Sequence, residues 1–142
     1  MARPLQRSLR NIMWLHCGVV RTEDGLFTGL DELNQIRESS LDLDVRPSSE
    51  GYQDLALALD LRASLESAEA TIRSAIERRE TRGAHNRSDY PEIDPAMKKN
   101  FVVVWNEDGQ QVLKEMEIDP LPVELERWMN DSEIEVAGRL LE

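Results

Sequence analysis

A long apolar repeat between Tyr52 and Arg82 constrains the fold of this 142-residue chain more than any other feature. Its spacings of three and four residues predict one long helix. A first stripe follows the whole helix and comprises Leu57, Leu61, Leu65, Ala68, Ile72, Ala75 and Ile76. A second stripe lies on the opposite side of its first half and comprises Tyr52, Leu55, Ala56 and Leu59. Packing against two short neighbours needs one stripe, so the second stripe predicts a further partner.

Two shorter helical patterns precede the long one. In residues 5 to 17 the apolar side chains share one face until Gly18 interrupts the pattern. Thr22 is expected to cap the next helix, because Glu23 and Asp24 favour the positive end of its dipole. That helix carries its own stripe and gives way to a loop at Ser39. The stripe comprises Leu26, Leu30, Leu33 and Ile36.

The C-terminal third of the chain predicts strands and then a tail. Residues 101 to 105 and 112 to 118 read as two strands joined across Asn106–Gly109, which indicates a β-hairpin. Beyond Pro122 the pattern is helical again, and Ser132 with Glu135 is typical of a capping box. The predicted fold is mainly α: a three-helix bundle with one long helix, followed by a β-hairpin and a short C-terminal helical tail. We divide it into a domain over residues 1–122 and an acidic helical tail over residues 123–142.

Composition excludes several classes of partner. The net charge of −11 argues against nucleic acid and anionic membranes, because phosphate contacts need clustered Lys and Arg. With one cysteine and two histidines, neither an intrachain disulfide nor a metal site is expected. No apolar run is long enough to cross a bilayer, so we expect no direct membrane insertion and a cytoplasmic location.

The polar segment from Arg78 to Pro91 closes the long helix, and Gly83 is the expected residue just beyond the helix end. It contains the candidate domain-interface or anion-pairing residues Arg82, His85, Arg87, Asp89 and Tyr90. The cations either hold an anion or pair with Asp89, Glu92, Asp94 or a carboxylate of a neighbouring domain, which would fix the loop. A histidine beside two cations is expected to lose its proton easily.

The same segment, Arg78-Arg79-Glu80-Thr81-Arg82-Gly83-Ala84-His85-Asn86-Arg87-Ser88-Asp89-Tyr90-Pro91, resembles the signature near the C-terminus of succinate dehydrogenase and fumarate reductase flavoprotein subunits. Further segments resemble that family in the same order, so the similarity covers roughly residues 5 to 122. They are residues 9–14, 18–21, 57–62, 68–70, 91–94 and 119–122. The tail departs from the family, and Asn100 stands where the family often has a histidine.

The resemblance implies an FAD-dependent oxidoreductase of dicarboxylates. Family members bind FAD through an N-terminal dinucleotide-binding domain and carry their dicarboxylate-binding residues upstream of this region. No GxGxxG turn follows a strand in this chain. We therefore expect a structural C-terminal domain with no catalytic, cofactor-binding or metal-binding residue of its own, and FAD in the parent enzyme. Other subunits could hold that parent at a membrane.

The expected partner is the FAD-binding domain of the parent, contacted through the second stripe and the loop from Arg82 to Tyr90. A second copy of this chain is the alternative partner in isolation. Two other functions remain open: the C-terminal domain of L-aspartate oxidase, and a free-standing helical dimerisation or protein-binding module. The hairpin and the ending Asp119–Pro122 favour the dehydrogenase side.

Overall fold

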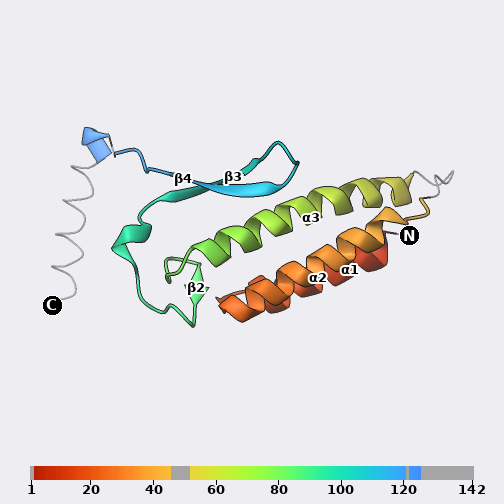
Figure 1. Cartoon of the computed structure of the whole chain (residues 1–142), viewed down its shortest axis with the longest axis horizontal. Helices are drawn as coiled ribbons and strands as arrows, with labels where there is room; N and C mark the ends of the chain where they lie inside the picture. The colour runs from red at the N-terminus through yellow and green to blue at the C-terminus, as the bar shows by residue number, and fades with distance from the viewer. Residues whose placement is uncertain (1, 46–51, 121, 126–142) are drawn as a thin grey trace.

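Three helices form an elongated bundle in the computed structural model, which describes residues 2–45, 52–120 and 122–125. They are α1 (Arg3–Cys17), α2 (Glu23–Leu41) and α3 (Gln53–Glu77). Helices α1 and α2 lie side by side with α3 along them, and a hairpin crosses the other side of α3 (Figure 1). The predicted mainly-α fold is confirmed. Of the predicted tail over residues 123–142, the part from residue 126 onward, with the Ser132–Glu135 capping box, lies outside the described residues.

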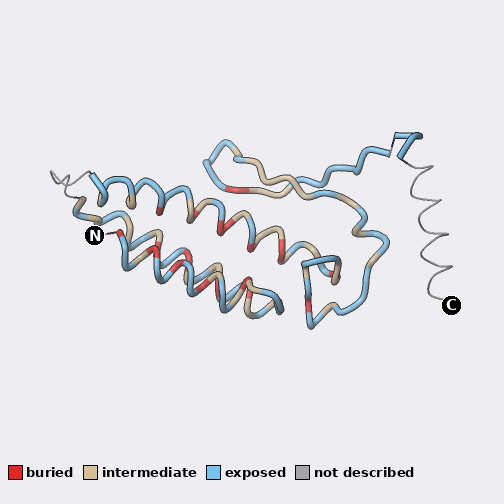
Figure 2. Tube along the Cα trace, turned by 180° about the vertical axis from the view of Figure 1, so that it is seen from behind, coloured by how far each residue is buried: buried red, intermediate tan, exposed pale blue. Residues whose placement is uncertain are grey.

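The core lies between the three helices, where Figure 2 shows their buried stretches facing one another. The stripes predicted for α2 and α3 supply most of it. Its members include Leu9, Ile12, Leu26, Leu33, Ile36, Leu61, Leu65, Ala68, Ile72 and Ala75. Gly29 lets α1 and α2 approach closely, because a Cβ at this position would lie 2.8 Å from the Cβ of His16.

Side-chain hydrogen bonds support the start and the last turns of α2. The Thr22 hydroxyl accepts from the Gly25 amide at 3.1 Å, which confirms the predicted cap. The helix continues through Ser39 and Ser40 to Leu41, so the prediction of a loop from Ser39 is wrong. Each of these hydroxyls donates to a carbonyl oxygen of the preceding turn, at 2.8 and 2.6 Å, and is thereby satisfied within the helix.

Helix α3 ends at Glu77, so the prediction that it reaches Arg82 is wrong. Arg78 already has an extended backbone, and the Arg87 guanidinium donates to the Ala75 carbonyl at 2.7 Å, taking one of the last carbonyls of the helix. Gly83 is therefore not the residue after the helix end. It has a φ of +57° in a tight turn where Arg82 and His85 exchange backbone hydrogen bonds.

A short parallel pair of strands links the α1–α2 connection to the loop that follows α3. Strand β1 (Val20–Arg21) pairs with β2 (Asn86–Arg87), with Val20 opposite Asn86 and Arg21 opposite Arg87. The sequence did not predict this pair, because two-residue strands carry no periodicity. It brings the α1–α2 connection against the loop that follows α3.

The hairpin confirms the predicted pair of strands. Strand β3 (Asn100–Trp105) runs antiparallel to β4 (Gln111–Met116), which ends two residues before the predicted Ile118. A short 3-10 helix, η1 (Pro95–Met97), precedes it. The second stripe of α3 lies outside the core: the residue exposures are 62% for Tyr52, 41% for Leu55 and 64% for Leu59, and Ala56 is exposed as well.

Candidate functional site

The candidate site is the segment from Arg78 to Tyr90, which we call the arginine loop. Its innermost residue is Arg87, a fully buried side chain at the end of β2. Nε and Nη2 of Arg87 each donate at 2.8 Å to one carboxylate oxygen of Asp89. The guanidinium also lies 4.9 Å from the centre of the Tyr90 ring. Burial, a two-pronged ion pair and an aromatic contact together leave this cation no room for an outside anion.

Glu80 is a second buried centre of the loop, and sequence reasoning missed it. Its Oε1 accepts from Arg78 at 2.6 Å and from Arg82 at 2.8 Å. Its Oε2 accepts from Arg82 at 3.0 Å and from the Asp94 amide at 2.9 Å. The hydrogen bond from Arg82, offset in part by burial, lowers the pKa of Glu80 to about 2. The signal available in the sequence was the spacing: Glu80 has one arginine two residues before it and another two residues after it.

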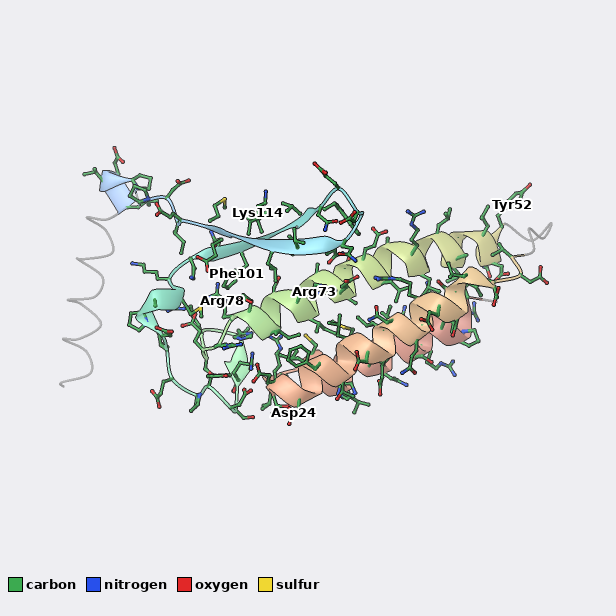
Figure 3. All side chains as sticks on the ribbon, viewed as in Figure 1. Asp24, Tyr52, Arg73, Arg78, Phe101 and Lys114 are labelled. Carbon is green, nitrogen blue, oxygen red and sulfur yellow. The ribbon has the colours of Figure 1, made fainter. Side chains whose placement is uncertain are left out.

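Arg78 ties this centre to the hairpin. Besides Glu80, its guanidinium donates to the carbonyl oxygens of Met97 at 2.9 Å and Lys99 at 2.7 Å. It also stands over the ring of Phe101 in β3, 5.0 Å from the ring centre, and Figure 3 shows these two side chains together near the end of α3. The arginine loop therefore fixes where the hairpin begins.

His85 sits among cations, as the sequence suggested. Its Nδ1 lies 2.7 Å from Nη1 of Arg21, and its Nε2 lies 3.0 Å from the carbonyl oxygen of Arg78. A guanidinium can only donate and a carbonyl can only accept, so Nδ1 accepts and Nε2 carries the proton. Burial lowers the pKa of His85, and the neighbouring arginines lower it further. No carboxylate among the described residues orients the ring, which gives it none of the support of a catalytic base.

Asp89 links the arginine loop to the start of α2. Its Oδ2 accepts from the Glu23 amide at 2.7 Å, where the positive end of the helix dipole favours a carboxylate. The hydrogen bonds from Arg87 hold the pKa of Asp89 down to about 2. Through this one side chain the buried Arg87 is connected to the first turn of α2.

The structure gives the loop cations different partners from those expected. Arg87 pairs with Asp89, which was among the expected acids, but Arg82 takes Glu80 as its carboxylate and meets Asp94 only through that residue's backbone oxygen at 3.2 Å. Of the five candidate residues, Arg87, Asp89 and Tyr90 form one contacting group. Arg82 belongs to the Glu80 centre. This geometry favours internal pairing over anion binding.

The start of α2 does not fit the pyrophosphate of FAD. Strand β1 leads through Thr22 into α2, which is the order of elements that a dinucleotide site uses. However, the Asp89 carboxylate and the Thr22 hydroxyl already accept from two amides of the first turn, those of Glu23 and Gly25, and Glu23 and Asp24 add two negative charges there. A phosphate at this helix end would meet repulsion rather than free N–H donors.

The described part of the chain holds neither a cluster of metal ligands nor a helix that could cross a membrane. No group of three or more His, Cys, Asp or Glu side chains there is arranged to hold a metal ion. Among the same residues, no helix combines the length and the apolar character that crossing a membrane requires.

Comparison with known proteins gives a consistent result. Residues 6–139 match the protein family described as fumarate reductase flavoprotein C-term. The succinate dehydrogenase flavoprotein subunit of Rickettsia conorii is 34% identical over 111 residues, covering 77% of this chain and 19% of that protein. L-aspartate oxidase of Acinetobacter baylyi is 31% identical over 107 residues, covering 73% of this chain and 18% of that protein.

A solved structure shares the fold as well. A mutant of E. coli quinol fumarate reductase superposes with a TM-score of 0.77 at 26% identity, over 86% of this chain and 22% of the matched chain. The chain therefore spans about a fifth of the length of the proteins it matches.

Proposed function

This chain belongs to the family of fumarate reductase flavoprotein C-terminal domains, and from this premise we propose that it is the structural C-terminal domain of an FAD-dependent flavoprotein that oxidises or reduces a dicarboxylate. The resemblance drawn from the segment Arg78–Pro91 is thereby confirmed. The substrate and electron transfer belong to the parent enzyme, where other subunits could hold the flavoprotein at a membrane. FAD would be held by the part of the parent that lies outside this chain.

The observation that carries the proposal is that three arginines of the arginine loop are paired with carboxylates of the loop itself. Arg78 and Arg82 share Glu80, and Arg87 is paired with Asp89. Cations that bind a substrate carboxylate must keep donors available for it, whereas these donors are used to lock α2, α3 and the hairpin together. A rigid scaffold suits a domain whose task is to hold the remaining domains in place for chemistry that occurs elsewhere.

We further propose that residues 1–122 act as this scaffold, with residues 123–142 as a separate tail. The exposed second stripe supplies an apolar face for a neighbour, as expected for Tyr52, Leu55, Ala56 and Leu59. In the parent that neighbour is the FAD-binding domain; in the isolated chain it is a second copy.

L-aspartate oxidase is the second candidate for the parent, because a relative of that name matches 73% of this chain. The two candidates share the scaffold role and differ in the substrate of the parent. A free-standing dimerisation module is the candidate of another class, and it requires self-association without any need for a flavin-containing partner.

The test uses the Rickettsia conorii flavoprotein subunit in three forms: intact, without the segment that matches this chain, and with this chain in place of that segment. We call the last form the restored flavoprotein. We expect the shortened form to lose FAD retention and succinate oxidation, and the restored flavoprotein to regain both. If the restored flavoprotein binds FAD but is neither more stable nor more active than the shortened form, the scaffold role is contradicted. The same replacement is made in the L-aspartate oxidase of Acinetobacter baylyi, and turnover is measured with L-aspartate. Comparing the activity regained in the two proteins separates the two candidate parents.

A further inference from the structure

Arg21 differs from the arginines around it in lacking a carboxylate partner. The cations of the arginine loop pair with carboxylates: Arg78 and Arg82 with Glu80, and Arg87 with Asp89. Arg21, directly opposite Arg87 in the β1–β2 pair, instead donates through Nε to the carbonyl oxygens of Cys17 at 3.3 Å and Gly18 at 3.0 Å. No ion pair to Arg21 occurs within residues 2–45, 52–120 and 122–125.

The remaining contact of Arg21 does not neutralise it. Nη1 of Arg21 lies 2.7 Å from Nδ1 of His85, which is an uncharged acceptor in this arrangement. Nε and Nη1 are thus in use, while Nη2 has no hydrogen-bond partner among the described residues. A half-buried guanidinium with an unused prong is suited to a carboxylate oxygen, since charge-assisted bonds of this kind are among the strongest in proteins.

Arg21 also borders an open hollow. Together with His85 it forms one side of a concavity of about 490 Å³, whose other walls are α3 and β3. Ser74 and Phe101 lie on those walls. The hollow can admit a side chain from outside this chain and bring it to the unpaired cation.

The chain leading to Arg21 is unusually apolar on its surface. Trp14 and Leu15, in the last turn of α1, are 75% and 70% exposed, and Val19 and Val20 are 73% and 57% exposed. We call these four residues and Arg21 the corner surface. A run of large exposed apolar side chains ending in an unpaired cation is typical of a surface that another protein covers.

We propose that the corner surface contacts the FAD-binding part of the parent flavoprotein, and that a carboxylate of that part enters the hollow and accepts a hydrogen bond from Arg21. This inference rests on the proposed function. About four fifths of each matched protein lies outside the region similar to this chain, so such a protein contains enough further structure to cover the surface. The charge of Arg21 specifies an acidic residue as its partner.

The experiment compares hydroxyl-radical oxidation of Trp14 in the isolated 142-residue chain and in the restored flavoprotein, read by mass spectrometry. We expect oxidation of Trp14 to fall severalfold in the restored flavoprotein. Leu41, which is 81% exposed, serves as the reference for radical dose, and Tyr52 reports separately on the second stripe. Unchanged oxidation of Trp14 in a flavoprotein that retains FAD would overturn the proposal.

A second measurement tests the cation itself. Arg21→Ala in the restored flavoprotein should lower the temperature of FAD release on the order of 5 °C, and Arg21→Lys should recover part of the loss. Arg10→Ala, at an exposed position of α1, is the matched control and should leave that temperature unchanged. The unfolding temperature of each isolated variant corrects for any effect on the fold of this chain. Equal release temperatures for Arg21→Ala and Arg10→Ala would contradict the carboxylate contact.

The two proposals fail in different ways. If the restored flavoprotein does not retain FAD, the scaffold function fails and the corner surface with it. If FAD is retained while Trp14 remains fully reactive and Tyr52 is protected, the scaffold function stands and the contact lies on the second stripe instead.

Discussion

The guanidinium of Arg87 faces both carboxylate oxygens of Asp89, two residues further along the chain, with each N–O distance at 2.8 Å. The same guanidinium donates to the Ala75 carbonyl near the end of α3, and the same carboxylate accepts from the Glu23 amide at the start of α2. One ion pair thus joins the ends of two helices. The arginine loop works as a clamp on the bundle, which explains why Arg87 is buried.

Replacing Arg87 should destabilise the domain strongly. Arg87→Ala removes the partner of Asp89 and leaves the Ala75 carbonyl at the end of α3 without its donor, and a buried acceptor left unsatisfied costs about 1–3 kcal/mol. Arg87→Lys keeps the charge but loses the two-pronged geometry, so it should recover only part of that loss. Urea unfolding followed by circular dichroism measures both. A free energy of unfolding equal to that of the control Arg10→Ala would contradict the clamp.

The Glu80 centre should make the domain sensitive to acid. The folded-state pKa of Glu80, about 2, lies below the ordinary value of 4.5. The unfolded chain therefore binds the proton more readily, and stability falls as the pH drops from about 4.5 towards 2.

Glu80→Gln removes this contribution. We expect it to lower the unfolding temperature at pH 7 and to flatten the loss of stability between pH 5 and pH 2 relative to the unaltered chain, as followed by thermal unfolding across that range. Asp89, with its pKa of about 2, remains in both proteins and contributes equally. Parallel pH profiles for the two proteins would rule out a depressed pKa at Glu80.

Gly29 should tolerate no side chain, because α1 and α2 meet there. The methyl group of Gly29→Ala would lie 2.8 Å from the Cβ of His16, which the α1 backbone fixes, so the helices must separate at a cost of about 1–3 kcal/mol. Gly83→Ala is the matched comparison: nothing lies within 4 Å of its added methyl group, and only the φ of +57° opposes it. That backbone penalty is about 1 kcal/mol. Thermal unfolding should place Gly29→Ala below Gly83→Ala, and the reverse order would disprove the close approach.

The second stripe predicts self-association of the isolated chain. Leu55→Glu and Leu59→Glu place a charge in an exposed apolar face, so they should shift the sedimentation of the chain from dimer to monomer while helical circular dichroism is retained. Leu41→Glu, at a position that is 81% exposed and outside the stripe, is the control. An unaltered chain that sediments as a monomer at high concentration would remove the dimer hypothesis.

The helices and the hairpin were predictable because their signals are local and repeated. The stripe of α3 recurs from Leu57 to Ile76, and Thr22 caps α2 as expected. The end of α3 was not predictable in this way. It depends on Arg87, which is ten residues beyond Glu77 in the sequence and lies in the β1–β2 pair.

In the arginine loop, too, some features could be predicted from the sequence and others could not. Its residue types predicted charge pairing, and the easy deprotonation expected of His85 agrees with its lowered pKa. The identity of the partners required the fold: only the structure shows that Arg82 donates to the Glu80 carboxylate and meets Asp94 through its backbone oxygen alone. Arg21 came to this site through a pairing of two-residue strands, which no periodicity in the sequence indicates.

The most direct test of the account is FAD binding and dicarboxylate turnover by the purified 142-residue chain. An equilibrium titration followed by the fluorescence of FAD measures the first, and dye reduction with succinate measures the second. We predict neither stoichiometric binding nor turnover, because Asp89 already accepts from the Glu23 amide at the start of α2, and Arg82 and Arg87 are paired with carboxylates of the loop itself. One FAD bound per chain, with succinate oxidised, would contradict the claim that this domain is a scaffold for chemistry performed elsewhere.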